Sequence, residues 1–133
     1  MPRLPTALLP VLIAALLSAC GGRDAFTSEA GLSEHERELK RAFALCAGCH
    51  GVAPEHGNRV GPNLYRVIGR QVGSLPGYSY STALAESDLV WDEQNLDTFM
   101  RNPPAMFHGT RMVVATSDPA RRAAIIQYLK QHQ

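Results

Sequence analysis

The sequence of 133 residues has few aromatic side chains and no excess of charge of either sign. It contains four Phe, four Tyr and one Trp, and 13 Lys and Arg residues stand against 12 Asp and Glu residues. Without a basic surplus the chain lacks the charge that neutralises phosphates, which excludes nucleic acid as a principal partner. The length excludes a multidomain protein. Because only the first 19 residues are membrane-directed, an integral membrane protein is also excluded, which leaves one small domain with three cysteines.

The N-terminus has the pattern of an export signal. Arg3 precedes an apolar run from Ala7 to Leu17, and these eleven residues are too few for the roughly 20 that span a bilayer. The run ends in Leu-Ser-Ala-Cys20, which resembles the lipobox of bacterial lipoproteins. That resemblance implies a signal peptide at 1–19 and a lipid on Cys20. The alternative is an ordinary signal peptide that is followed by a cysteine.

Residues 20–32 are predicted to form a flexible tether. They have low hydrophobicity and no sustained periodicity, and such a segment has a root-mean-square reach of about 20 Å. The tether leads into a single folded domain at 33–133. Arg3 is the only charged residue of the signal peptide, so cleavage leaves equal numbers of basic and acidic residues in the mature chain.

Four helical segments are indicated by capping residues and by apolar residues at helical intervals. Ser33 and Glu36 have capping-box spacing before a helix from about 34 to 46. Residues 64–68 predict one or two helical turns. Asp92 is the predicted N-cap of a third helix, which must end before Pro103. Asp118-Pro119 begins the last helix.

Long loops separate these helices, and no segment alternates with the period of a strand. The loops contain Gly and Pro at several positions, and they are predicted at 51–62, 71–80 and 103–117. The pattern predicts an all-α domain whose long loops need something to pack against, a role that a large apolar cofactor would fill.

Cys46-Ala-Gly-Cys49-His50 is a C-x-x-C-H sequence, the attachment motif of c-type haem. Two thiols three residues apart on a helix end can bond to both vinyl groups of one haem, and the adjacent imidazole can reach the iron. A redox dithiol would need a preceding strand in a βαβ setting. A zinc site would need two further ligands at matching spacing, which the other histidines do not offer. With Cys20 lipidated, no cysteine remains for a disulfide.

A second axial ligand would make the iron an electron carrier, whereas an open site would allow ligand binding or catalysis. Met100 lies on the apolar side of its helix, as a core residue would. Met106 and Met112 both lie in the loop after Pro103, and spacing alone does not separate them. Two histidines, His56 and His108, are further candidates.

From Leu39 to Leu129 the sequence resembles a class I cytochrome c of the mitochondrial and bacterial long-loop type. The matching segments occur in the family's order, and they are Cys46, Cys49 and His50; Gly61-Pro62-Asn63-Leu64; Gly69-Arg70; Pro76-Gly77-Tyr78-Ser79-Tyr80; Trp91; Asn102-Pro103; Gly109-Thr110-Arg111-Met112; and Ile126-Gln127-Tyr128-Leu129-Lys130. The resemblance implies a cytochrome c fold of short helices and long loops around one covalent haem c.

The resemblance also implies roles for individual residues. His50 would be the proximal ligand of the iron and Met112 the distal ligand, with the Pro62 carbonyl accepting a hydrogen bond from the His50 ring. The residues that would surround the haem and its propionates are Arg70, Tyr80, Trp91 and Thr110.

Four positions depart from the family pattern. Phe99 replaces a Tyr whose hydroxyl would reach the methionine sulfur, and His108 replaces a Pro and places a rival ligand near the distal site. Leu84 stands where an Asn joins a water network. Leu39 stands where a small Gly lets the terminal helices cross, so the crossing is predicted to persist with a wider or shifted contact.

The sequence therefore predicts an electron carrier rather than an enzyme: a monomeric, lipid-anchored cytochrome on the periplasmic side of a bacterial membrane, inner or outer. Its donor would be a quinol-oxidising complex or a dehydrogenase, and its acceptor a terminal oxidase or reductase. Because Lys is scarce, a rim of Arg59, Arg66, Arg70 and Arg111 would face these partners, and the tether would replace charge steering. The alternatives are a dedicated haem subunit of one oxidase or dehydrogenase, and a haem sensor with a labile sixth ligand.

Overall fold

The computed structural model describes residues 31–133. The predicted signal peptide, Cys20 and nearly all of the predicted tether lie outside the described residues. The elements in chain order are α1 (Glu34–Ala47), a 3-10 turn (Pro54–His56), α2 (Thr82–Ala85), α3 (Glu93–Arg101), α4 (Pro103–Met106) and α5 (Pro119–Lys130). Between residues 31 and 133 the β pairing is confined to one bridge, Gln71 with Val90. The all-α prediction is confirmed, and none of the described helices is long and apolar enough to cross a membrane.

Helix α1 begins where the sequence predicts, because side chains of its first turn form hydrogen bonds with the backbone N–H groups there. The Ser33 side chain accepts from the Glu36 N–H at 3.2 Å, and the Ser33 N–H donates to the Glu36 carboxylate at 2.7 Å. The helix buries Leu39 and Phe43. It ends at Ala47, so Cys46 lies in its last turn.

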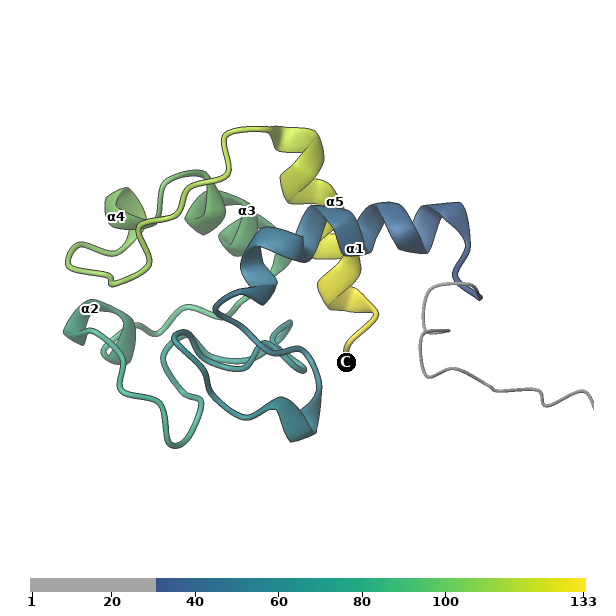
Figure 1. The fold of residues 1–133 in the computed structure, drawn as a ribbon. Helices are drawn as coiled ribbons and strands as arrows, with labels where there is room; N and C mark the ends of the chain where they lie inside the picture. Colours follow the sequence, from purple (N-terminus) through teal and green to yellow (C-terminus); the bar gives the residue numbers. More distant parts are fainter. Residues whose placement is uncertain (1–30) are drawn as a thin grey trace, which may run out of the picture.

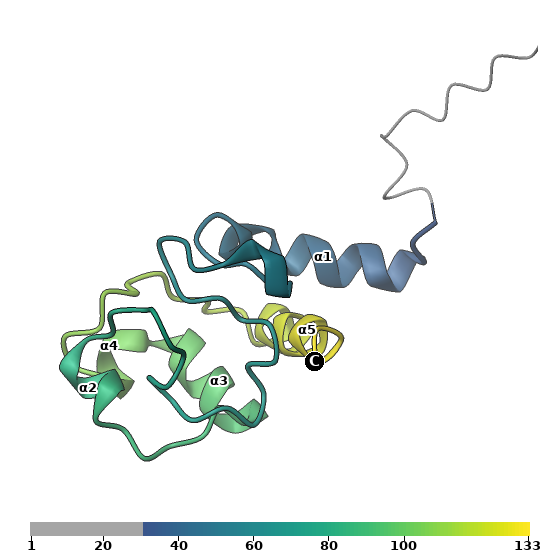
Figure 2. The ribbon, with the colours of Figure 1, turned by 90° about the horizontal axis from the view of Figure 1, so that it is seen from below.

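Helix α5 crosses α1, and this pair forms one side of the domain (Figures 1 and 2). The Phe43 ring stacks on Tyr128 with centroids 4.8 Å apart, while Leu39 and Ile125 are each only 2% exposed. The predicted crossing therefore persists, with a leucine buried where the family pattern has glycine. Asp118 caps α5 by accepting from the Ala120 N–H at 2.9 Å.

Helix α3 connects this pair to the aromatic core. Asp92 caps it by accepting from the Asn95 N–H at 2.7 Å, as the sequence predicts, and the helix ends at Arg101 before Pro103. Its Phe99 ring lies 5.1 Å from Trp91 and 5.8 Å from Phe107, measured between centroids. These three rings, the aromatic cluster, join α3 to the segment that follows α4.

Residues 64–68 do not form the predicted helix. Arg66 has φ of +52°, a conformation outside the right-handed helix, and its N–H donates to the His132 carbonyl at 2.8 Å instead of to a carbonyl four residues earlier. The segment forms two successive turns. A contact with the far end of the chain thus overrides the local helical pattern.

The predicted loop at 103–117 begins instead with the short helix α4. Proline is tolerated in the first turn of a helix because the first N–H groups have no helical partner, and Asn102 caps this turn by accepting from the Ala105 N–H. Helix α2 is likewise a single turn that was not predicted. Figure 1 shows α2 and the loops of residues 48–80 below α4 and the segment 107–117, with the end of α1 beside them.

Candidate haem site

The two cysteines of the C-x-x-C-H motif lie at the C-terminal end of α1. The N–H groups of Cys49 and His50 both donate to the Cys46 carbonyl, at 3.0 and 2.9 Å, so the chain makes one tight turn. Both cysteines are free thiols and half-buried. Burial raises the pKa of Cys46, and the nearby Arg121 opposes this shift. The turn places two unpaired thiols and one imidazole at the same helix end.

His50 is held by the backbone of Pro62. Its Nδ1 lies 2.7 Å from the Pro62 carbonyl oxygen, which can only accept, so Nδ1 carries the proton and Nε2 keeps its lone pair. Burial lowers the pKa of His50, which favours the neutral ring, while the bond to Pro62 opposes that shift. A neutral imidazole with a free Nε2 is the form that binds a metal.

Gly61 lets the chain pass directly beside this ring. A Cβ at Gly61 would overlap the His50 imidazole, and the Gly61 N–H donates to the Cys49 carbonyl at 2.9 Å. The sequence places Gly61 in a matched motif but does not assign it this packing role. Only the approach of residue 61 to residue 50 in space reveals it.

Arg70 lies close to Tyr80, and its backbone is hydrogen-bonded to that of Trp91. The Arg70 guanidinium donates to the carbonyls of Asn63 and Tyr65 at 2.9 and 3.2 Å, and the backbone N–H of Trp91 donates to the Arg70 carbonyl at 2.9 Å. Burial lowers the pKa of Arg70 and raises that of Tyr80, and each group opposes the other's shift. Arg70 is directed at backbone carbonyls, so it is not part of a rim.

A side-chain oxygen that the sequence does not single out lies beside Tyr80. Ser81 Oγ is buried and has no hydrogen-bond partner among residues 31–133. Ser81 and Tyr80 line a groove of about 430 Å³ together with His108 and Arg111. Buried hydroxyls normally have partners, and these side chains supply the donors that carboxylates at a haem edge require. The donor set therefore fits the group that the cysteines would hold.

The three candidate methionines have different surroundings. Met100 is 6% exposed in α3, as predicted for a core residue, while Met106 and Met112 are half-buried and pack against the core. The Met112 N–H donates to Thr110 Oγ1 at 3.3 Å, and Thr110 is itself buried. Two thioethers thus remain as candidates on the segment after α3, and Met112 has a polar side chain that fixes its backbone.

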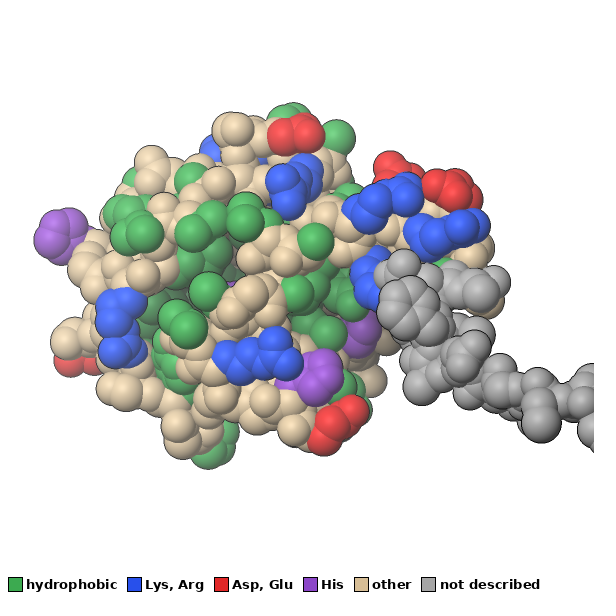
Figure 3. Space-filling model, viewed as in Figure 1, with side chains coloured by type: hydrophobic (Ala, Val, Ile, Leu, Met, Phe, Trp, Pro, Cys, Tyr) green, Lys and Arg blue, Asp and Glu red, His purple; other side chains and the backbone are tan. Residues whose placement is uncertain are grey.

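The described residues contain no group of three or more His, Cys, Asp and Glu side chains that could hold a metal ion. The alternative of a zinc site therefore lacks a ligand set in this part of the chain. Figure 3 shows hydrophobic side chains gathered around a recess in the face of Figure 1. A large apolar group with its own iron suits such a recess.

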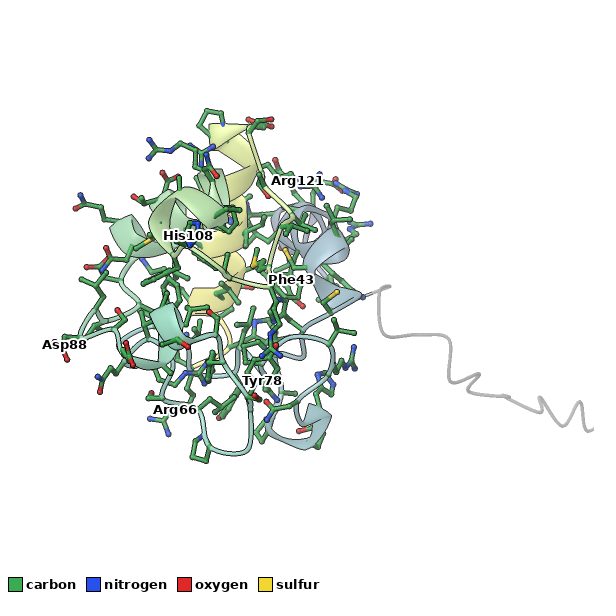
Figure 4. All side chains as sticks on the ribbon, turned by 90° about the vertical axis from the view of Figure 1, so that its left-hand side faces the viewer. Phe43, Arg66, Tyr78, Asp88, His108 and Arg121 are labelled. Carbon is green, nitrogen blue, oxygen red and sulfur yellow. The ribbon has the colours of Figure 1, made fainter. Side chains whose placement is uncertain are left out.

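One of the four predicted rim arginines, Arg111, lies beside Tyr78. Arg111 lies over the Tyr78 ring, 5.8 Å from its centroid, and the Tyr78 hydroxyl donates to the Val60 carbonyl at 2.9 Å, next to Arg59. Figure 4 shows Tyr78 and His108 on the face toward the viewer and Arg66 near the lower edge. With Arg70 directed inward, the predicted rim is reduced to Arg59, Arg66 and Arg111, which are all exposed.

The chain is similar to known cytochromes over most of its described length. It is 42% identical over 91 residues to cytochrome c2 of Rhodomicrobium vannielii, which covers 68% of this chain and 73% of the relative. It is 44% identical over 90 residues to cytochrome c2 iso-2 of Magnetospirillum fulvum, covering 67% and 93% respectively. No family model matches the chain.

A solved structure shows the same fold. Cytochrome cH from Methylobacterium extorquens superposes with a TM-score of 0.66 at 38% identity, covering 72% of this chain and 97% of that structure. The likeness in sequence and in fold agrees with the paired thiols, the neutral histidine and the polar groove. The chain belongs to the cytochrome c family of electron-transfer proteins, and it binds one covalent haem c through Cys46 and Cys49.

Proposed function

We propose that this protein is a single-electron carrier whose haem iron is held by His50 and Met112, and that a lipid on Cys20 tethers it to the periplasmic side of a bacterial membrane. The observation that carries the ligation proposal is the contact between His50 Nδ1 and the Pro62 carbonyl, 2.7 Å long. It directs the lone pair of Nε2 to a metal and raises the basicity of the ring.

The bound haem supplies one reversible electron. On the protein side, the neutral thioether of Met112 favours the reduced, less charged state, and burial of the site acts in the same direction, so we expect a positive potential. Thr110 positions the ligand by accepting the Met112 N–H. Arg70, Tyr80 and Trp91 would surround the propionates, and the unpartnered Ser81 hydroxyl is a further donor.

The partners are redox proteins, and we propose that they lie on or in the same membrane. A quinol-oxidising complex or a dehydrogenase would donate the electron, and a terminal oxidase or reductase would accept it. The support for the tether is the lipobox-like sequence ending at Cys20 and the polar segment to residue 32. A monomer is sufficient for this role, since one chain carries the complete set of haem-binding residues.

The arrangement of charge supports tethering in place of long-range steering. Most basic side chains in α1, α3 and α5 form ion pairs: Arg37 and Arg41 share Glu34, Arg101 and Arg122 share Asp97, and Lys130 pairs with Glu93. Arg59 and Arg111 instead contact the Ala47 carbonyl and the Tyr78 ring. These arginines and the exposed Arg66 give weak attraction at a distance, whereas attachment to one membrane raises the effective concentration without new contacts.

Carbon monoxide tests the ligation directly. The visible spectrum of the ferrous protein should not change when the gas is added, because both axial positions are filled, whereas Met112→Ala should bind it. Met106→Ala is the matched control and should behave as the native protein. If the native protein binds the gas readily, the sixth position is labile and a sensor is favoured. If only Met106→Ala opens the site, the distal ligand is Met106.

A further inference from the structure

Arg122 is a buried cation that joins α5 to α3 and to the segment just before α5. It is 6% exposed, although arginine is almost never fully buried unless it is paired. Its Nε donates to Asp97 Oδ1 in α3 at 2.7 Å. Its Nη1 donates to the carbonyls of Thr116 and Ser117 at 3.0 and 2.8 Å. One guanidinium thus joins α5, α3 and the segment that precedes α5.

That segment carries Met112, and its two ends are fixed in different ways. The first end is anchored by Phe107 in the aromatic cluster, to whose carbonyl the Thr110 N–H donates at 3.1 Å. The second end is anchored by Arg122 and by the Thr116 N–H, which donates to the Met100 carbonyl at 2.7 Å. We call residues 110–117 the ligand loop.

The middle of the ligand loop has little support of its own. Val113 and Val114 are 74% and 49% exposed. No acceptor in the described part of the chain takes a hydrogen bond from the N–H groups of residues 113–115. The place of Met112 therefore depends on the two anchored ends, and at the second end Arg122 supplies the side-chain hydrogen bonds.

We propose that Arg122 is a positioning residue for Met112: by holding the Thr116 and Ser117 carbonyls it keeps the ligand loop closed and the thioether on the iron. The proposal rests on the ligation of the iron by Met112. A buried ion pair alone is weak evidence for stability, so the two bonds to loop carbonyls carry the argument. Charge-assisted bonds of this kind are stronger than neutral ones, and leaving the two carbonyls without donors is costly.

Asp97 provides a matched control, because it binds two arginines. Arg101 donates to Asp97 Oδ2 at 2.9 Å, but its side chain is 59% exposed and makes no hydrogen bond to the ligand loop within residues 31–133. Arg101→Leu also removes one positive charge from beside Asp97, but it leaves the hydrogen bonds to the ligand loop intact. Arg122→Lys keeps the charge but loses the planar fork that reaches Asp97 and the loop together.

The experiment compares holo-proteins of Arg122→Leu, Arg122→Lys, Arg101→Leu and Met112→Ala. The measurements are the rate of carbon monoxide binding to the ferrous form, the weak long-wavelength band of the ferric iron–thioether bond, the midpoint potential and the melting temperature. We expect Arg122→Leu to bind the gas at least about tenfold faster than the native protein, as the loss of one charge-assisted bond implies. Arg122→Lys should be intermediate, with a weakened band and a nearly native melting temperature.

The controls separate this proposal from the ligation on which it rests. Arg101→Leu should match the native protein in rate and band; if it equals Arg122→Leu, charge at Asp97 is responsible and the proposal is overturned. Native behaviour of both Arg122 variants, with Met112→Ala open to the gas, overturns the positioning role alone. If Met112→Ala stays closed, both the ligation and the positioning role fail. Should Arg122→Leu not fold, Arg122→Lys decides the result.

Discussion

Gly61 lies directly against the His50 ring, so that a single added methyl group would occupy the space of the imidazole. The same histidine is held from its Nδ1 side by the carbonyl of the next residue, Pro62. One dipeptide therefore both restricts the position of the ring and fixes its protonation. The segment 61–62 therefore supports the histidine that we propose as the proximal ligand.

Gly61→Ala should displace His50 and destabilise the holo-protein by about 1–3 kcal/mol, the usual cost of overpacking. The visible spectrum should change together with the urea midpoint. Gly48→Ala is the control, because a Cβ there would meet only the Leu45 carbonyl at 3.6 Å and φ is −62°. It should be neutral or stabilising by up to about 1 kcal/mol. A native spectrum and stability for Gly61→Ala would contradict the packing role.

Asp97 should make the fold sensitive to acid. Its hydrogen bonds with Arg122 and Arg101 lower its pKa below the ordinary value of 3.8. A carboxyl group whose pKa is lowered on folding contributes stability above its unfolded pKa, and the contribution is lost as the pH falls through the folded pKa. Asp97→Asn should therefore reduce the melting temperature at pH 6 and flatten its decline below about pH 4.

Glu93→Gln is the control for this prediction, since Glu93 pairs with Lys130 at 2.7 Å in an exposed setting, where ion pairs contribute about 0–1 kcal/mol. Its melting temperature should follow the native curve between pH 6 and pH 3. Equal acid dependence of Asp97→Asn and the native protein would show that this carboxylate does not control the transition.

Local signals predicted the elements whose ends are fixed by their own side chains. Ser33, Asp92 and Asp118 each cap a helix within three residues of themselves, so their helices begin where the sequence indicates. The helix predicted at 64–68 was wrong because the backbone conformation there depends on a hydrogen bond from the Arg66 N–H to the His132 carbonyl. A contact between residues half a chain apart leaves no local pattern.

The same distinction applies to the site. The attachment motif lies within five consecutive residues, so the haem-binding cysteines could be predicted from spacing alone. Ser81 and Arg122 could not, because what marks them is burial: one hydroxyl without a partner and one guanidinium enclosed by three acceptors. In the sequence they are an ordinary polar residue and an ordinary charged helix residue.

Cys20→Ser should release the protein from the membrane without changing its haem. A lipid with two acyl chains anchors stably because each buried methylene contributes about 0.8 kcal/mol, and the substitution removes the attachment atom. Fractionation of cells followed by the visible spectrum of each fraction measures both effects. Ser18→Ala, which keeps the cysteine, should remain with the membrane. Retention of Cys20→Ser in the membrane fraction would contradict the lipid tether.

Electron transfer to the membrane partner should depend only weakly on salt. A carrier steered by charge loses rate steeply as ions screen it, because the screening length falls from about 30 Å at 0.01 M to about 3 Å at 1 M. Here most basic side chains of α1, α3 and α5 are paired with carboxylates, so the attraction to be screened is small. For the native protein in its own membranes, we expect a change of less than about threefold across this range.

The soluble Cys20→Ser form, which lacks the gain from tethering, should transfer electrons more slowly at every salt concentration. A steep decline for the native protein, parallel to that of a steered soluble carrier, would show that Arg59, Arg66 and Arg111 suffice for steering and that the tether is not what brings the partners together.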